Sequence, residues 1–251
     1  MTAPSEALAA LRREMAAACR VLAARGLADG FLGHISLRTG PDRLLVRCRG
    51  PREQGLAFTD AGDIHLVSFA GEPAAAGELD GWSVPNELPL HTEVLVRRPD
   101  VAAVVHAHPP AVVAADLAGV GIRPIVGAFD IPGAKLAAGG VPVYRRGVLI
   151  RSRRLATEMA DSLGSRPAVV LRGHGLTTCG ASVAEAVLHA VSIDRIARLS
   201  LAVVSAGGQL QDLPAEDLAE LPDLGAGFTV QTAWRHELAR LPAISSSPPA
   251  G

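Results

Sequence analysis

The sequence is poor in aromatic residues and in cysteine, and each scarcity limits what the chain can be. Aromatic residues make up 3% of the 251 positions, and Tyr144 is the single tyrosine. The three cysteines, Cys19, Cys48 and Cys179, are odd in number and far apart, so they indicate neither a disulfide framework nor a paired-cysteine metal site. The simplest expectation is a protein of the reducing cytoplasm.

Long apolar runs and an excess of charge are also missing. No stretch approaches the ~18 apolar residues that a helix needs to span a bilayer. Arg12, Arg13 and Glu14 interrupt the apolar pattern near the N-terminus, which argues against a signal peptide. The formal net charge of −1 gives no electrostatic footprint for nucleic acid or for an anionic membrane. We therefore expect a soluble protein without either partner.

Hydrophobic residues make up 49% of the chain, enough to fill a core, and their pattern alternates between strand-like and helical segments. With no internal repeat and no linker, the pattern predicts one mixed α/β domain over residues 1–242. The last residues, 243–251, are expected to be a disordered tail. Short β-like runs predict strands in "HISLR", "RLLVRC", "DIHLVSF", "VAAVVHAH" and "AVVLRGHG". Helical spacing predicts helices near 8–25, 84–98, 109–119, 153–163 and 182–206.

Two histidines close one of these apolar runs, in "VVHAHPP". His106 and His108 are two positions apart, so in a strand their side chains point to the same face, and two prolines end the strand beyond them. Such a pair can hold one divalent cation between its ring nitrogens. The alternative is a pair of polar side chains at a solvent-facing strand end.

A third histidine follows another apolar run, in "VVLRGHG". His174 lies between two glycines, which allow the backbone to bend and return the imidazole towards a neighbouring site. On its own the motif also fits an ordinary turn histidine. Together with His106 and His108 it is a candidate third ligand, and three ligands leave an open position of the kind found in catalytic metal sites.

A carboxylate stands at the start of a predicted helix in "VPNELPLH". Glu87 could be a fourth ligand or a general acid/base beside the metal, or only a partner of the helix dipole. Asn86 is a possible cap of the same helix, and His91, one turn later, is interpreted as a packed or hydrogen-bonded residue.

These motifs, in this order, resemble the class II aldolase/adducin family. The similarity covers "LGHIS", "NELPLH", "RPDVAAVVHAHPP" and "LRGHG", which is followed by a long helix. It implies His106, His108 and His174 as ligands of a divalent metal, which could be Zn²⁺, Mn²⁺, Fe²⁺ or Co²⁺. It also implies Glu87 as the catalytic acid/base, a mostly antiparallel central sheet between helical layers, and a homotetramer with active sites at subunit interfaces.

The chain departs from the sugar-phosphate aldolases of that family where they bind phosphate. In place of their small polar groups it has His34, Arg49-Gly50 and Pro85-Asn86, with Arg47 close by. A guanidinium matches a planar carboxylate, so these changes favour a carboxylate substrate, although a solvated arginine cluster would give the same pattern. The aldolases' tyrosine proton donor is also missing, because the corresponding segment "RPIVGAFD" contains none.

These departures make the chain similar to the dihydroxyphthalate and dihydroxybenzoate decarboxylase branch of the family. The resemblance implies a metal-dependent lyase that removes CO₂ from a dihydroxylated aromatic carboxylate. Glu87 would protonate the ring with His34 as a helper, and Arg49, Arg47, Gly50 and Asn86 would bind substrate. Two alternatives remain: an aldolase for a small unphosphorylated or carboxylated substrate, and a non-catalytic adducin-like interaction module.

Overall fold

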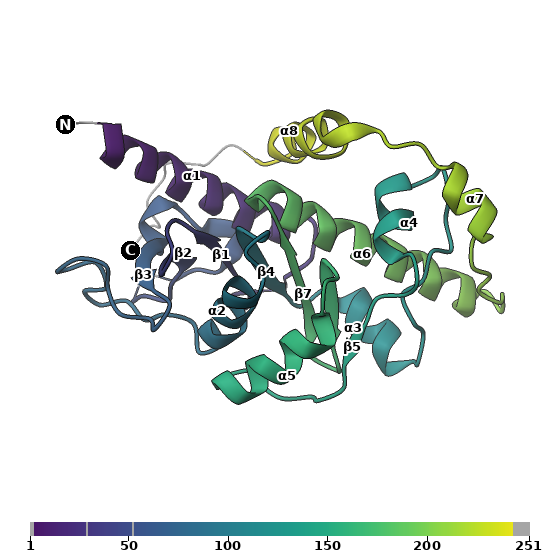
Figure 1. Ribbon diagram of the computed structural model, residues 1–251, viewed down its shortest axis with the longest axis horizontal. Helices are drawn as coiled ribbons and strands as arrows, with labels where there is room; N and C mark the ends of the chain where they lie inside the picture. Colours follow the sequence, from purple (N-terminus) through teal and green to yellow (C-terminus); the bar gives the residue numbers. More distant parts are fainter. Residues whose placement is uncertain (1–2, 29, 52, 243–251) are drawn as a thin grey trace.

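A seven-stranded sheet runs through the middle of the molecule in the computed structural model, and helices cover both of its faces (Figure 1). The structure describes residues 3–28, 30–51 and 53–242. The strand order is β3-β2-β1-β4-β7-β6-β5, and each neighbouring pair is antiparallel except β5 and β6. The strands are β1 (His34–Arg38), β2 (Arg43–Arg47), β3 (Ile64–Ser68), β4 (Ala103–Ala107), β5 (Val143–Tyr144), β6 (Ala168–Leu171) and β7 (Gly175–Gly180).

Helices form the two outer layers and the C-terminal segment. On one face of the sheet lie α1 (Ala3–Ala24), α3 (Pro110–Leu117), α4 (Ile131–Ala137) and the long α6 (Val183–Ser205) (Figure 1). On the other face lie α2 (Leu88–Arg97) and α5 (Arg153–Leu163). Short 3-10 turns are η1 (Leu56–Phe58) and η2 (Ala61–Asp63); the C-terminal segment contains α7 (Ala215–Glu220), the π-helical η3 (Gly227–Thr232) and α8 (Ala233–Ala239). Within these described residues no helix combines the length and the apolar character that crossing a membrane would need.

The alternation of side chains along β4 separates two hydrophobic cores. Ala103 and Val105 pack into the core beneath α1, α3 and α6, whereas Val104 packs into the core beneath α2 and α5. Because successive side chains of a strand point to opposite faces, His106 follows Val104 to the α2/α5 side. On β1 the same alternation sends Ile35 to the first core and leaves His34 on the second side.

The predicted architecture, a single layered α/β domain around a mostly antiparallel sheet, is confirmed. All five predicted strands and all five predicted helices are present, with ends shifted by a few residues. The prediction that Asn86 caps α2 is wrong: Glu87 occupies the N-cap position, and no side chain caps that helix. The predicted disordered tail lies outside the described residues.

Two regions contain structure that the sequence pattern did not predict. No helix or strand was predicted in the glycine-rich stretch that ends at Tyr144, but it contains α4 and β5. Asp130 is the N-cap residue of α4, and its carboxylate accepts a hydrogen bond from Gly133 N. An aspartate in this position was therefore the sequence signal that could have predicted the start of the helix. Strand β7 has a glycine at each end and adjacent threonines, so it lacks the apolar alternation that marks a strand.

Candidate metal centre and active-site pocket

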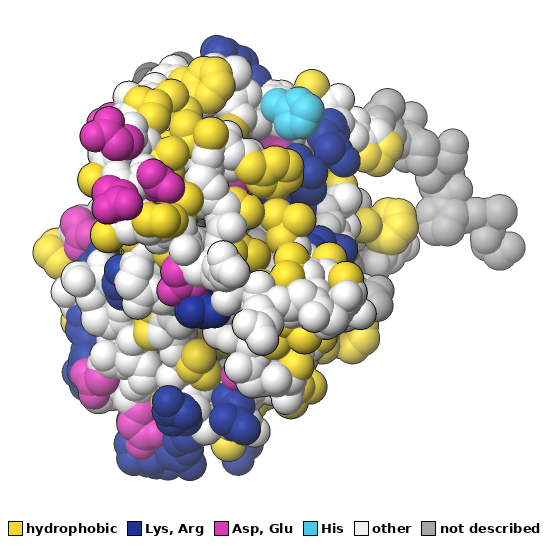
Figure 2. Space-filling model, turned by 90° about the vertical axis from the view of Figure 1, so that its right-hand side faces the viewer, with side chains coloured by type: hydrophobic (Ala, Val, Ile, Leu, Met, Phe, Trp, Pro, Cys, Tyr) yellow, Lys and Arg dark blue, Asp and Glu magenta, His cyan; other side chains and the backbone are white. Residues whose placement is uncertain are grey.

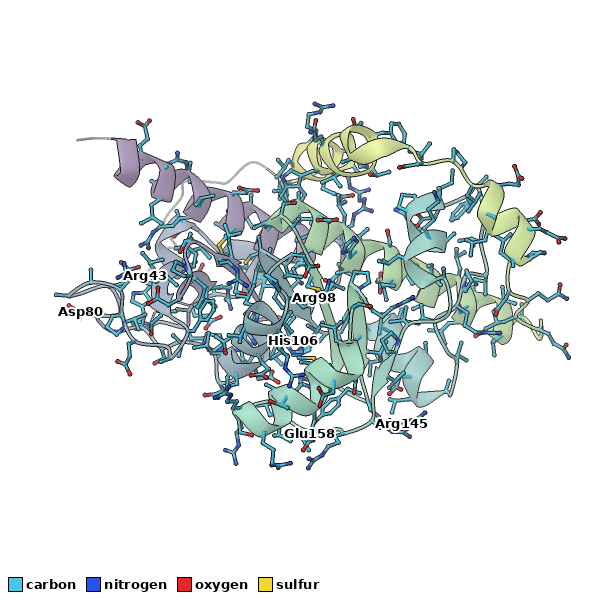
Figure 3. All side chains as sticks on the ribbon, viewed as in Figure 1. Arg43, Asp80, Arg98, His106, Arg145 and Glu158 are labelled. Atoms are coloured by element: carbon cyan, nitrogen blue, oxygen red, sulfur yellow. The ribbon has the colours of Figure 1, made fainter. Side chains whose placement is uncertain are left out.

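The three predicted metal ligands and Glu87 converge on one point at the end of the sheet. His106 lies in β4, His108 directly follows that strand, His174 lies in the turn between β6 and β7, and Glu87 precedes α2. One ligand atom from each of the four side chains lies within 4.8 Å of the others. In Figure 3, His106 occupies the interior of the molecule between α2 and α5. Segments far apart in the sequence therefore build one cluster.

The same type of atom faces the centre of this cluster from each histidine. His106 Nε2 lies 2.9 Å from His108 Nε2. Glu87 Oε2 lies 3.4 Å from His106 Nε2 and 3.7 Å from His174 Nε2. Three imidazole nitrogens and one carboxylate oxygen are a donor set that suits Zn²⁺, Mn²⁺, Fe²⁺ or Co²⁺. The residues present therefore fit the divalent cation that the sequence predicted.

Glycine is required next to His174 because other backbone atoms approach closely. A Cβ on Gly175 would lie 2.4 Å from the carbonyl oxygen of Ala107 and 2.8 Å from Cδ2 of His108. Gly173 has a φ of 58°, and its N–H donates to the Asp116 carboxylate at 2.7 Å. The two glycines of the "GHG" motif thus let the turn pack against the HxH segment, as the sequence analysis expected.

Glu87 is oriented by the backbone and by the histidines. Its Oε1 accepts a hydrogen bond from Ile150 N at 2.8 Å, which leaves Oε2 directed at the cluster. Burial raises the pKa of Glu87, but its interactions with His106, Ile150 N and His174 outweigh burial and lower that pKa to about 2. In the free pocket Glu87 is therefore a carboxylate at neutral pH, able to accept a proton or bind a cation.

A second hydrogen-bonded group lies directly behind the cluster. His34 Nδ1 lies 2.6 Å from His91 Nε2, and His91 Nδ1 lies 2.8 Å from Ser36 Oγ. All three side chains are buried. Burial lowers the pKa of His91 to about 3, and burial together with His91 and His106 lowers the pKa of His34 well below its usual value. His91 is the hydrogen-bonded, buried residue that we expected.

A cavity of about 560 Å³ opens in front of the cluster. Its apolar wall comes from Leu32, Val148 and Leu149. None of the three was predicted as a site residue: Val148 and Leu149 lie in a loop without a motif, and Leu32 begins "LGHIS" but is an ordinary apolar side chain. The Arg49 side chain is 35% exposed and stacks over the Phe31 ring, with 5.5 Å between Cζ and the ring centroid. Six of the nine predicted site residues line the cavity: His34, Arg49, Asn86, Glu87, His108 and His174.

Two of the predicted substrate-binding residues lie behind the cavity wall. The Arg47 guanidinium is buried, donates to Gly33 O at 3.3 Å and to Thr59 Oγ1 at 3.2 Å, and pairs with the Glu53 carboxylate. Its donors are therefore occupied by the protein itself. Gly50 packs against the Trp82 ring and does not line the cavity: a Cβ there would lie 2.4 Å from that ring.

The single tyrosine takes no part in this pocket. Tyr144 is buried in β5, and its hydroxyl donates to the Glu158 carboxylate at 3.1 Å. Within the described residues, the segment "RPIVGAFD" also contributes nothing to the cavity wall. Among the described residues that line the cavity, the titratable side chains are Glu87, Arg49, His34, His108 and His174.

Basic side chains gather near the cavity, at the lower edge of the molecule. Figure 2 shows Lys and Arg side chains along this edge, and Figure 3 places Arg145 there beside Glu158. Arg145, Arg151 and Arg172 are exposed, and none has a carboxylate within 4.0 Å among the residues the structure describes. The loop that carries two of them also supplies Val148 and Leu149 to the cavity wall. Arg145 and Arg172 line a separate cavity, and the charged side chains that line the cavity in front of the cluster are those of Arg49 and Glu87.

The profile of the Class II Aldolase and Adducin N-terminal domain family matches residues 13–201. The chain belongs to this family. It is 70% identical over 236 residues to a 3,4-dihydroxyphthalate decarboxylase of Arthrobacter keyseri, covering 94% of this chain and 95% of that one. It is 56% identical over 231 residues to a 3,4-dihydroxyphthalate decarboxylase of Rhodococcus jostii (strain RHA1), covering 92% of this chain and 95% of that one. The predicted family and branch are confirmed.

Solved structures of class II aldolases share the fold at low sequence identity. An L-fuculose 1-phosphate aldolase from Glaciozyma antarctica PI12 superposes with a TM-score of 0.73 at 22% identity, covering 93% of this chain and 90% of that one. An aldolase II superfamily protein from Pseudomonas syringae has a TM-score of 0.74 at 23% identity, with 92% and 93% of the two chains covered. The layered sheet is thus the family fold.

Proposed function

We propose that this class II aldolase family member is a metal-dependent carboxy-lyase that removes CO₂ from a dihydroxylated aromatic carboxylate. The substrate that the similar proteins name, 3,4-dihydroxyphthalate, is the first candidate. One observation carries the proposal: the three-histidine and glutamate cluster lies at the same cavity as the partly exposed guanidinium of Arg49, whose carboxylate neighbour Glu53 is 4.0 Å away. The cluster supplies the chemistry, and the guanidinium favours a carboxylate over a phosphorylated sugar.

The cavity provides a place for each part of such a substrate. Leu32, Val148 and Leu149 form an apolar wall that suits a flat ring. The Arg49 guanidinium would hold the carboxylate that is retained, and Asn86 lines the cavity beside Glu87 as a further polar contact. His106, His108 and His174 would hold a divalent cation, which as a Lewis acid stabilises negative charge on substrate oxygens.

Glu87 is the group that can move the proton. It starts as a carboxylate, so it can accept the proton of the ring hydroxyl and deliver it to the ring carbon that carries the departing carboxylate. The carbon–carbon bond then breaks, CO₂ leaves, and its bonding electron pair returns to the ring. A solvent proton restores the hydroxyl, so one proton replaces one CO₂ in each turnover.

The proposal is tested by offering metal-loaded protein a panel of substrates. Dihydroxyphthalates, dihydroxybenzoates and hydroxy-aldehyde aldol adducts are incubated separately, and CO₂ and aldehyde are both measured. Release of CO₂ from a dihydroxyphthalate supports the proposal. Release of aldehyde without CO₂ would instead assign an aldolase for an unphosphorylated or carboxylated substrate. A protein that takes up no divalent cation and acts on nothing would support the non-catalytic, adducin-like alternative.

We also propose that the chain works as a homo-oligomer, a tetramer by its family membership, and that it acts in the cytoplasm. The exposed apolar side chains Phe31, Leu32 and Leu149 at the cavity mouth support an assembly that covers this mouth with a neighbouring subunit. Light scattering of the purified protein measures the mass of the assembly and tests the tetramer directly.

A further inference from the structure

The buried chain of hydrogen bonds behind the metal cluster points to a function for His91. His91 lies in the second turn of α2 and is fully buried, with one ring nitrogen facing His34 and the other facing Ser36. Only His34 of these three residues reaches the cavity. His91 can therefore influence a substrate only through the ring of His34.

The surroundings of His91 Nδ1 determine which of its nitrogens carries the proton. Ser36 Oγ lies 2.8 Å from Nδ1, and the backbone of Val104 raises the pKa of His91, the direction expected when a ring N–H faces a carbonyl oxygen. Ser36 and Val104 are paired in register between β1 and β4, so this carbonyl lies on the Ser36 side of the ring. A carbonyl oxygen only accepts hydrogen bonds, so the His91 proton belongs on Nδ1.

This assignment fixes the tautomer of His34 as well. A neutral imidazole with its proton on Nδ1 offers a lone pair at Nε2, so His91 Nε2 accepts a hydrogen bond from His34 Nδ1–H across the 2.6 Å contact. His34 Nε2 is then the unprotonated nitrogen. It lies 3.9 Å from Glu87 Oε2, beyond hydrogen-bond distance, and is therefore available to a molecule in the cavity.

We propose that His91 is a positioning residue that holds His34 in the tautomer whose Nε2 accepts a hydrogen bond from a substrate hydroxyl. The inference rests on the proposed function for the identity of the ligand, a ring with two adjacent hydroxyls. It replaces the sequence-based interpretation of His34 as a helper in proton donation: in this tautomer His34 accepts, and it orients the hydroxyl beside Glu87.

Ligand binding to matched variants tests this inference. The probes are 3,4-dihydroxybenzoate, the product expected when the carboxylate next to a ring hydroxyl is lost, and its analogues 3-hydroxybenzoate and 4-hydroxybenzoate. Their Kd values are measured by calorimetry on the full-length Zn²⁺-loaded protein. The variants are His91→Leu, which removes the acceptor, and His91→Gln, whose amide oxygen can still accept from His34 Nδ1–H.

The expected result depends on which hydroxyl is present. His91→Leu should weaken binding of 3,4-dihydroxybenzoate about 3- to 10-fold, the usual net effect of one hydrogen bond. The same loss should occur with one of the monohydroxy analogues and be absent with the other, which lacks the contacted hydroxyl. His91→Gln should restore most of the affinity. Equal losses for all three probes would overturn the proposal, because a merely structural residue would give that result. No loss for any probe would overturn it as well.

The tautomers can be measured without any substrate. Two-bond ¹⁵N–¹H spectra of the ¹⁵N-histidine-labelled protein, assigned with His34→Gln and His91→Gln, report which ring nitrogen carries the proton. Protonated Nδ1 on both rings is expected, and a His34 protonated at Nε2 would overturn the inference. If the wild type shows this tautomer yet binds no probe and releases no CO₂, the proposed function fails instead.

Discussion

His106 Nε2 and His108 Nε2 lie 2.9 Å apart, with both lone-pair positions directed at the point that His174 and Glu87 also face. Two imidazoles on one strand edge meet in this way because i and i+2 side chains share a face. When a cation lies between the two rings, both nitrogens can coordinate it, and neither ring has to donate a hydrogen bond to the other. The contact therefore leads directly to a prediction about metal content.

His106→Ala and His174→Ala should each lower divalent metal affinity and activity together, by about 100-fold or more, since changes to the partners of metal ligands alone cost 10- to 100-fold. Metal is measured by atomic emission after dialysis, and activity by CO₂ release. His236→Ala, an exposed histidine outside the cavity, is the matched control. A His174→Ala protein that keeps its full metal content would remove His174 from the ligand set.

Glu87→Gln should keep the metal and lose turnover by about 100- to 10,000-fold, the contribution of a positioned proton-transfer group. The amide retains the size of the side chain and can still accept from Ile150 N through its oxygen, so the fold is expected to survive. Metal content and kcat are measured on the same preparation. Normal turnover would transfer the proton chemistry to another group.

Arg49→Ala should weaken catalysis with a dicarboxylate more than with a monocarboxylate. A hydrogen bond to a charged group contributes about 1.5–3 kcal/mol, so kcat/KM for a dihydroxyphthalate should fall about 10- to 100-fold. Arg43→Ala, whose side chain is 54% exposed on β2, is the control (Figure 3). Arg47→Ala should instead lower the melting temperature, because it removes a buried guanidinium that bonds Gly33 O, Thr59 and Glu53. Equal losses for both substrates with Arg49→Ala would place this guanidinium outside the binding site.

The metal-free protein should lose stability as the pH falls from about 6.5 towards 3. Burial lowers the pKa of His91 and of His108 to about 3 in the folded state, whereas both titrate near 6.5 when unfolded. Between these values the unfolded chain binds more protons, so the free energy of unfolding rises with pH and is lost on acidification. Melting temperatures measured in EDTA from pH 7 to pH 4 test the sign. His91→Gln should flatten the slope, and an unchanged slope would contradict the assignment.

Gly175→Ala should weaken metal binding although glycine is not a ligand. The added Cβ would push against His108 Cδ2 and the Ala107 carbonyl, at 2.8 and 2.4 Å, and so displace one ligand ring. Gly227→Ala is the matched control, because a Cβ there meets nothing within 4 Å. Metal titration followed by calorimetry compares the two. Equal affinity in both variants would show that the turn moves without cost.

The sequence predicted the elements that carry motifs better than those that carry none. "HISLR" and the helix at 153–163 match the observed β1 and α5 to the residue because alternation and helical spacing are strong there. Strand β7 was missed because its threonines face inward for a reason the pattern does not contain: Thr178 donates to Ala186 O on α6, and Thr177 lies beside His106. Tertiary contacts, rather than local preference, hold these polar residues in a strand.

In the candidate site, too, the sequence predicted the residues that belong to motifs and did not predict the contacts that only the folded chain forms. Ligand types and spacing predicted the metal cluster, since chemistry dictates both. Which arginine faces the cavity could not be read from the sequence, because Arg47 and Arg49 sit two positions apart and both approach Glu53. The hydrogen bonds from Arg47 to Thr59 and to Gly33 O distinguish the two. The hydrogen bond between His34 and His91 joins segments 57 positions apart, a pairing that no local pattern reveals.

The pairing of His34 with His106 across β1 and β4 has a consequence for how this enzyme can diverge. A single inserted or deleted residue in either strand would move its side chains to the opposite face of the sheet. The imidazole of that strand would then lie under α6, and a neighbouring apolar side chain would face the cavity. Length changes should therefore be excluded from these two strands and tolerated in the loop 70–77, where the chain crosses the surface. Among natural relatives, alignment gaps should show that division, and a deletion library scored for folding and activity would reproduce it.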